Sequence, residues 1–339
     1  MTPRALLGLA IAGALALGGG WYFGTASTPP RKAAMDAGRL MFPDLTAKLK
    51  DAARIEITGK SKTTAIALKN GVWGLEDRGG YRVQETKLRG MLTALTELRL
   101  VEPRTTDPAL FGRLGVEDPI TEKEGTANLL RVLDAAGKPI VSVIAGHRRM
   151  RTQGNVPEQV YVRLPGDSQS WLAEGGLQAD TDPQVWLDRD VINVQQWRVA
   201  KVVATRPAGT VELVRDGDKL KVTKPAEYPK LDAYKIDDVA RALESLTFVD
   251  VKPATEPLGD PVGEAVFTTQ DGLDIKVVVH RLDKDSWTTF SVTGTEKVKS
   301  DAEFSQARLA GWAFQTGAGK EKAFLPTIDD MKAAEAAKP

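Results

Sequence analysis

The chain has 339 residues, of which 42% are hydrophobic and 27% are charged, and this length allows two ordinary domains with buried cores. Lys and Arg number 46 and Asp and Glu number 45, so the formal net charge of +1 leaves no basic surplus for a nucleic-acid backbone. Because there are no cysteines, disulfides, thiolate metal sites, a cysteine nucleophile and a lipid-modified N-terminal cysteine are excluded.

The N-terminal region, residues 1–30, is predicted to be a membrane anchor. No charged residue occurs from Ala5 to Phe23, and about 20 apolar residues suffice for a helix to cross a bilayer, whereas the core of a signal peptide is usually shorter. The aromatic residues 21–23 are of a kind that lies at membrane interfaces. We expect an uncleaved single-pass anchor in the inner membrane, with the bulk of the chain on the periplasmic side. A signal peptide cleaved after Gly24-Thr25-Ala26 is the alternative.

Residues 53–158 have the pattern of an α+β module. The dipeptide Asn70-Gly71 is typical of a tight hairpin turn, and it joins two strand-like runs, Thr64–Lys69 and Val72–Glu76. Further strands are expected on either side of Gly137. Between the two pairs of strands a helix is predicted, because apolar residues recur at the spacing of one helical stripe. The stripe consists of Leu88, Met91, Leu92, Leu95 and Leu98.

Residues 197–316 repeat this pattern. Asp216-Gly217 takes the place of the first hairpin turn, and Leu258-Gly259 echoes Leu114-Gly115. The second helical stripe lies 148 positions after the first and consists of Ile236, Val239, Ala240, Leu243 and Leu246. The sequence therefore predicts an α+β fold of two tandem copies of an antiparallel-sheet-plus-helix module after an N-terminal transmembrane segment. Two unrelated domains with similar helices are the alternative.

Two further regions complete the predicted organisation. Residues 159–196 are expected to connect the modules through a hairpin and a short helix that begins at Asp182-Pro183. Another helix is predicted from about Asp301 to Gln315. The remaining segment, 317–339, is rich in Ala and charged residues near its end and is expected to be a flexible tail.

Candidate catalytic and metal-binding residues are few. The only histidines, His147 and His280, have no acidic or histidine partner at metal-ligand spacing. Carboxylates between Asp180 and Asp190 lack the glycine and terminal glutamate of an EF-type calcium loop. The stretch Asp188-Arg189-Asp190 is instead expected to be a solvated turn. We therefore predict no catalytic residue, no metal site and no cofactor, and we do not expect an enzyme.

One basic cluster occurs in the folded part, and it contains His147, Arg148, Arg149 and Arg151. We expect it in a loop between strands, where it would contact an acidic protein partner or anionic lipid head groups. A solvated hairpin end without a partner is the alternative interpretation.

Several motifs together resemble a bacterial envelope family known as domain of unknown function 4340. They are Asn70-Gly71-Val72-Trp73-Gly74-Leu75, the segment Phe111–Pro119, Val160-Tyr161-Val162-Arg163 and Trp186-Leu187-Asp188-Arg189-Asp190-Val191-Ile192. The resemblance extends over roughly Ala53 to Phe314. The order of the motifs is more specific to the family than any single motif. It implies an N-terminal membrane segment and an accessory role beside ABC-type export or gliding-motility components. It implies no catalytic residue.

Three classes of function remain open. The first is a non-enzymatic accessory or interaction subunit with a protein partner in the inner membrane, such as an ABC-type transport system. The second is a ligand-binding protein that uses a cleft between the two modules, because ligand sites favour domain interfaces. The third is an envelope hydrolase that uses scattered carboxylates. Of the three, the motifs and the missing catalytic constellation favour the interaction subunit.

Overall fold

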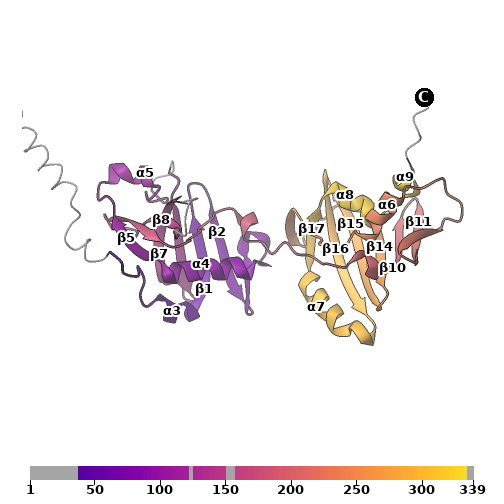
Figure 1. Ribbon diagram of the computed structural model, residues 1–339, viewed down its shortest axis with the longest axis horizontal. Helices are drawn as coiled ribbons and strands as arrows, with labels where there is room; N and C mark the ends of the chain where they lie inside the picture. Colours follow the sequence, from indigo (N-terminus) through magenta and orange to yellow (C-terminus); the bar gives the residue numbers. More distant parts are fainter. Residues whose placement is uncertain (1–36, 122–124, 150–156, 334–339) are drawn as a thin grey trace, which may run out of the picture. The chain divides into compact units, whose positions relative to one another are not determined.

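The computed structural model describes residues 37–121, 125–149 and 157–333, and the chain divides into two compact units (Figure 1). The first unit is Met1–Trp73 with Glu85–Trp186, and the second is Gly74–Gln84 with Leu187–Pro339. The predicted anchor, Ala5–Phe23, lies outside the described residues. None of the helices within the described ranges has the length and apolar character needed to span a bilayer.

The first sheet has nine antiparallel strands in the order β4-β3-β2-β1-β6-β7-β8-β9-β5, and the division between the units falls within β3. The strands are β1 (Ala52–Thr58), β2 (Thr63–Lys69), β3 (Val72–Leu75), β4 (Tyr81–Arg82), β5 (Arg99–Pro103), β6 (Asn128–Asp134), β7 (Pro139–Arg149), β8 (Gln159–Arg163) and β9 (Ser170–Glu174). The Asn70-Gly71 turn between β2 and β3 has positive φ at both residues, 52° and 79°, as a tight hairpin turn requires.

Helix α4 (Glu85–Glu97) lies across one face of the first sheet (Figure 1). Its predicted apolar stripe is buried at Leu88, Met91 and Leu95, and Leu98 just beyond the helix is fully buried as well. The helix and its orientation towards the sheet are therefore confirmed. The shorter helices of this unit are α3 (Leu45–Lys48) and α5 (Phe111–Leu114), with 3-10 turns η1 (Leu49–Asp51), η2 (Glu76–Arg78), η3 (Pro108–Leu110) and η4 (Pro183–Val185), of which η2 belongs to the second unit.

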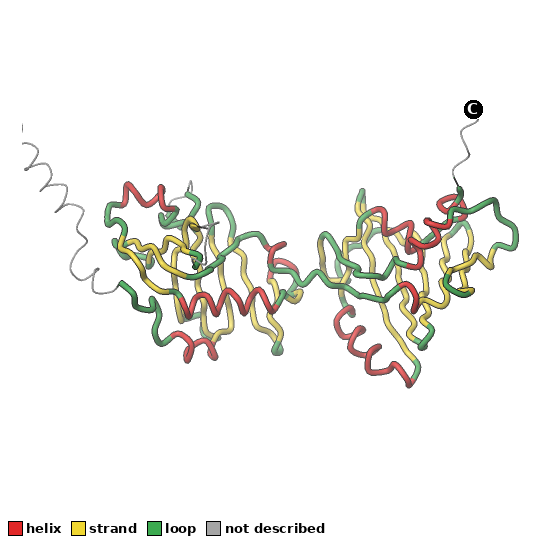
Figure 2. Tube along the Cα trace, in the orientation of Figure 1, coloured by secondary structure: helices red, strands yellow, loops and turns green. Residues whose placement is uncertain are grey.

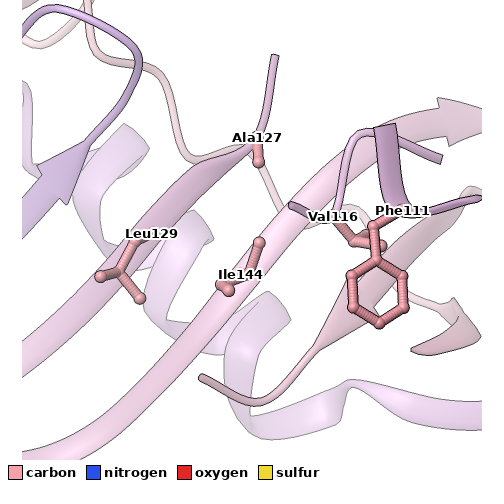
Figure 3. Close-up of a cluster of buried hydrophobic side chains, with 5 residues drawn as sticks. All are labelled: Phe111, Val116, Ala127, Leu129 and Ile144. Carbon is pink, nitrogen blue, oxygen red and sulfur yellow. The ribbon is translucent and has the colours of Figure 1, made fainter. Parts of the chain in front are cut away.

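A second cluster of buried side chains holds α5 against β6 and β7 (Figure 3). Phe111 on α5 and Val116 just after it pack with Ala127, Leu129 and Ile144. The chain turns back after α5 through Gly115, whose φ of +67° belongs to the left-handed region and suits glycine at a helix C-terminus. The Phe111–Pro119 motif thus works as a small packed cap on this part of the sheet.

The second sheet has eight antiparallel strands in the order β12-β11-β10-β14-β15-β16-β17-β13. The strands are β10 (Val199–Arg206), β11 (Gly209–Asp216), β12 (Lys219–Lys224), β13 (Asp250–Pro253), β14 (Asp260–Thr269), β15 (Leu273–Leu282), β16 (Asp285–Gly294) and β17 (Trp312–Thr316). The helices are α6 (Ala233–Ala240), α7 (Lys299–Leu309), α8 (Ala318–Phe324) and α9 (Ile328–Met331), with 3-10 turns η5 (Gln196–Arg198) and η6 (Glu296–Val298). Figure 2 shows how much of each unit is strand.

The two sheets share one succession of strands once β4 is set aside. In each, the first strand lies between its hairpin partner and the second strand after the helix, so β1 lies between β2 and β6 and β10 between β11 and β14. Thr58 and Thr63 pair across β1 and β2 with their hydroxyl oxygens 3.0 Å apart, and Thr205 and Thr210 pair in the same way across β10 and β11 at 3.4 Å. Both β1 and β10 also shift register near their beginnings, against β6 and β14.

Some expected boundaries differ from the structure. The hairpin β8–β9 is part of the first sheet, between β7 and β5, and not part of a separate connection over 159–196. Strand β9 is buried on both faces from Ser170 to Ala173, whereas β8 alternates, with Val160 and Val162 on one buried face. Strand β16 was not predicted. Helix α6 ends at Ala240, earlier than expected, yet the later stripe residues Leu243 and Leu246 are still buried in the turns that follow.

The C-terminal region is more ordered than the sequence indicated. The predicted helix over 301–315 ends at Leu309, and Gly311, with φ +82°, leads into strand β17. The segment expected to be a flexible tail forms α8 and α9, whose residues Phe324 and Met331 are buried. A capping box between Thr327 and Asp330 begins α9. The tail prediction was therefore wrong for residues 317–333, because their few apolar side chains find places in the core.

Candidate functional site

The predicted basic cluster lies on a strand and not in a loop. His147, Arg148 and Arg149 belong to β7, which continues because Arg148 and Arg149 pair with β8. The Arg148 guanidinium contacts the Glu158 carboxylate, with Nη2 2.6 Å from Oε2, and His147 Nε2 lies 2.9 Å from the Thr126 hydroxyl. Arg151 lies outside the described residues. The charge of Arg148 is thus partly compensated within the chain.

The two histidines lie in different units, each beside the glycine of a Leu-Gly pair. In the first unit Gly115 lies against the His147 ring, and in the second the Gly259 carbonyl oxygen lies 3.4 Å from His280 Nδ1. Within residues 37–121, 125–149 and 157–333, no group of three or more His, Asp or Glu residues is arranged to hold a metal ion.

An ion-pair cluster centred on Asp188 lies beside a surface hollow in the second unit. The Asp188 carboxylate accepts from Arg82 Nε at 2.6 Å and from Arg308 Nη2 at 3.1 Å. Arg82 also donates to the backbone carbonyls of Arg308 and Asp190, at 2.8 and 2.9 Å. The expectation of a solvated turn over 188–190 was wrong for Asp188, whose side chain is only 19% exposed.

Tyr81 bonds to the same region through its hydroxyl, and its ring belongs to an aromatic cluster. Its ring is fully buried and meets Phe248, Trp312 and Phe314 edge-on, with centroids 5.5, 4.9 and 5.9 Å away. Its hydroxyl donates to the Asp188 carbonyl oxygen at 3.1 Å. Burial raises the pKa of the Tyr81 phenol well above its ordinary value, so the hydroxyl remains a donor throughout the physiological pH range.

A hollow of about 280 Å³ lies beside this cluster, between α7 and two other segments of the second unit. We call it the α7 groove. Its lining includes Asp190, Val191, Ile192, Leu246, Phe304 and Arg308. Val191 and Leu246 are buried, and the segments that carry them are joined by backbone hydrogen bonds between Leu246 and both Val191 and Ile192.

Phe304 stands at the margin of the α7 groove and is 67% exposed. Helix α7 buries Ala302 and Leu309, and Gln306 accepts a hydrogen bond from the backbone of β16, so Phe304 is not directed into the core. The Arg308 guanidinium lies 5.7 Å from the Phe304 ring centroid, within the range of a cation–π contact. The helix predicted from about Asp301 to Gln315 gave no indication that Phe304 would be exposed.

A wider hollow of about 830 Å³ lies in the first unit. Its lining includes the carboxylates of Glu97, Glu158 and Glu174 together with Arg99, and Glu158 is already paired with Arg148. Because acidic and basic side chains both line this hollow, its charge favours neither an anionic nor a cationic ligand.

A family model described as "Domain of unknown function (DUF4340)" matches residues 73–262, more than half of the chain. The matched part contains Asp188 and the floor of the α7 groove but not α7 itself. A comparison with curated proteins finds no match.

Proposed function

The chain belongs to the DUF4340 family, and from this premise we propose that it is a non-enzymatic accessory subunit of a membrane assembly. In this proposal Ala5–Phe23 tethers the chain in the inner membrane and the two units lie on the periplasmic side. The uncharged N-terminal segment supports the tether. An ABC-type transport system is the kind of assembly that the family resemblance suggests.

We further propose that the two units are tandem copies of one module. The common strand succession supports this, as do the register shifts at the starts of β1 and β10 and the paired threonines across each first hairpin. The helical stripes at a constant spacing of 148 residues support it as well. A duplicated scaffold supplies two similar sheets. The loops and helices inserted between equivalent strands differ, so they can make different contacts.

The α7 groove is the main support for the proposed interaction role. A phenylalanine that keeps 67% of its surface in water beside a hollow with an apolar floor is an arrangement typical of an interaction site. The Asp188 ion pairs and the Tyr81 ring hold the surrounding segments in place, which reduces the entropy lost on binding.

Site-specific photo-cross-linking in cells that express the full chain tests this proposal. Benzoylphenylalanine in place of Phe304 is expected to give a discrete adduct of defined mass. The same group in place of Tyr234, an aromatic residue of the second unit that is 80% exposed and does not line the groove, is the matched control and should give none. Absence of an adduct at position 304, or equal adducts at both positions, would remove the α7 groove as an interaction face.

A further inference from the structure

We propose that the occupant of the α7 groove is the same groove of a second copy of this chain. In the resulting two-fold dimer, each Phe304 enters the hollow of the other copy. The inference rests on the proposed function, because it names the partner of the face that was assigned there.

The shape of the surface supports a self-complementary contact. A two-fold dimer joins one patch to its identical copy, so the patch must present both a projection and a hollow. The α7 groove does so, because the exposed Phe304 ring borders a hollow of about 280 Å³ with Val191 and Leu246 in its lining. An apolar cavity of about 150 Å³ already holds a benzene molecule, so the hollow has room for one phenylalanine ring.

The charges on the surface agree with the same arrangement. Asp190 and Arg308 both line the groove, and a two-fold axis between them brings the carboxylate of each copy towards the guanidinium of the other. Among the described residues, Arg308 donates side-chain hydrogen bonds only through Nη2, to the Asp188 carboxylate and the Asp190 carbonyl. Nε and Nη1 thus have no acceptor among these residues, and opposite charges across the contact favour one register.

The contact surface is held in position before association. The end of α7 is fixed by the hydrogen bond from Arg82 to the Arg308 carbonyl, and its middle is fixed by the bond between Val292 and Gln306. A surface that is already ordered loses little conformational entropy when a second copy binds.

The position of α7 in the fold limits the proposed assembly to two copies. In the second unit α7 lies in the connection between β16 and β17, residues 295–311, whereas the corresponding strands β8 and β9 are joined by residues 164–169 alone. Within the residues that the structure describes, the first unit therefore has no counterpart of the α7 face. A single self-complementary face closes into a dimer and does not propagate into a filament.

Disulfide trapping tests the proposal. Because the chain has no cysteine of its own, only the introduced cysteines can form disulfides. Full-length chains with Ser305→Cys are purified in detergent and mixed with differently tagged chains that carry Asn193→Cys, since both positions line the groove. Mild oxidation is expected to join the two tags. Lys219→Cys, exposed on β12 of the same unit, replaces Asn193→Cys in the control and should leave them separate.

Phe304→Ala in the Ser305→Cys chain is expected to lower the yield of the mixed disulfide about tenfold or more, as for truncation of an aromatic hot spot. The exposed position of Phe304 means that the variant should keep its melting temperature. Equal yields with Asn193→Cys and Lys219→Cys, or a yield that is unchanged by Phe304→Ala, would overturn the dimer.

The mass of the photo-adduct at position 304 separates this inference from the proposed function. An adduct of two copies of the chain supports both. An adduct with a different polypeptide overturns the second copy as occupant and leaves the interaction role standing. No adduct and no mixed disulfide would remove both.

Discussion

Arg82 and Asp188 form an ion pair, Nε to Oδ2 at 2.6 Å, although 106 residues separate them in the sequence. The contact exists because residues 74–84 belong to the second unit, apart from the helix and strands that follow them along the chain. It links a short hairpin to the motif Leu187-Asp188-Arg189-Asp190 and, through Arg308, to α7. The α7 groove therefore depends on residues from three distant parts of the chain.

Replacement of Asp188 with alanine should destabilise the second unit. The change leaves Arg82 and Arg308 without their carboxylate partner in a region that is mostly buried, and loss of one partner of a buried pair costs about 3–5 kcal/mol. Urea unfolding monitored by tryptophan fluorescence measures the change. Asp216→Ala, which removes the exposed ion pair with Lys221, is the control and should have a much smaller effect. Equal effects of the two changes would contradict the structural role of Asp188.

Tyr81→Phe should reduce the sensitivity of the protein to alkaline pH. The folded state raises the pKa of Tyr81, mainly through burial, so its contribution to stability is complete below the ordinary tyrosine pKa of about 10 and is lost as the pH rises above it. The free energy of unfolding of the wild type should consequently fall more steeply above about pH 10 than that of Tyr81→Phe. Tyr234→Phe, at an exposed position, should leave the wild-type slope unchanged. Parallel pH profiles for wild type and Tyr81→Phe would be evidence against the burial of this hydroxyl.

The two apolar stripes should contribute similarly to stability, although Leu243 lies in the turns after α6. Leu95 and Leu243 are both fully buried, and truncation of either to alanine is expected to cost about 2–5 kcal/mol. Leu68→Ala, at a position that is 38% exposed, provides the comparison and should cost much less. Calorimetry or chemical unfolding of the three variants gives the values. Near-zero losses at both 95 and 243 would show that these regions do not pack as described.

The C-terminal segment is expected to depend on a buried carboxylate. Glu321 on α8 contacts Arg281, accepts from the Ser286 hydroxyl at 2.8 Å and lies 3.6 Å from Arg206 Nη2. Glu321→Ala should lower stability by about 1.5–3 kcal/mol, the usual loss for a hydrogen bond to a charged group, because two partly exposed arginines lose their shared partner. Limited proteolysis should then cleave first within residues 317–333. Lys322→Ala, which affects an exposed side chain of the same helix, should leave the proteolytic pattern of the wild type.

Membrane retention tests the proposed tether. The full chain should stay in the membrane pellet after high-salt and carbonate washing, because about 20 apolar residues are enough to hold a helix in a bilayer. A variant in which Ala10 and Leu15 are both replaced with arginine should be released, since charge at the centre of a span is costly. Mature chain that begins at Ser27 and is recovered in the soluble fraction would identify the segment as a cleaved signal peptide.

Local features of the fold were predictable because they depend on neighbouring residues. The Asn70-Gly71 turn and the stripe from Leu88 to Leu98 follow from the requirements of a tight turn and of one buried helix face. Residues 312–315 were included in the predicted helix, because a short apolar run has no clear period and only its pairing with β13 and β16 makes it a strand.

The candidate site could be predicted only in part. The cluster His147, Arg148 and Arg149 was found from its charge, but the pairing of Arg148 with Glu158 depends on the register of β7 and β8. The motif that contains Asp188 was identified as a feature of the family. Its residues 188–190 were nevertheless predicted to form a solvated turn. Its partners, Arg82 and Arg308, lie 106 and 120 residues away, and no local rule connects them.

The placement of Tyr81 has a consequence for the order of events during synthesis. Its ring packs against Trp312 and Phe314, which leave the ribosome more than 200 residues after Tyr81. At roughly 5–20 residues per second, tens of seconds pass between the emergence of Tyr81 and that of these partners. Tyr81 lacks these native contacts during this interval, and the second unit completes its aromatic cluster only after β17 has emerged.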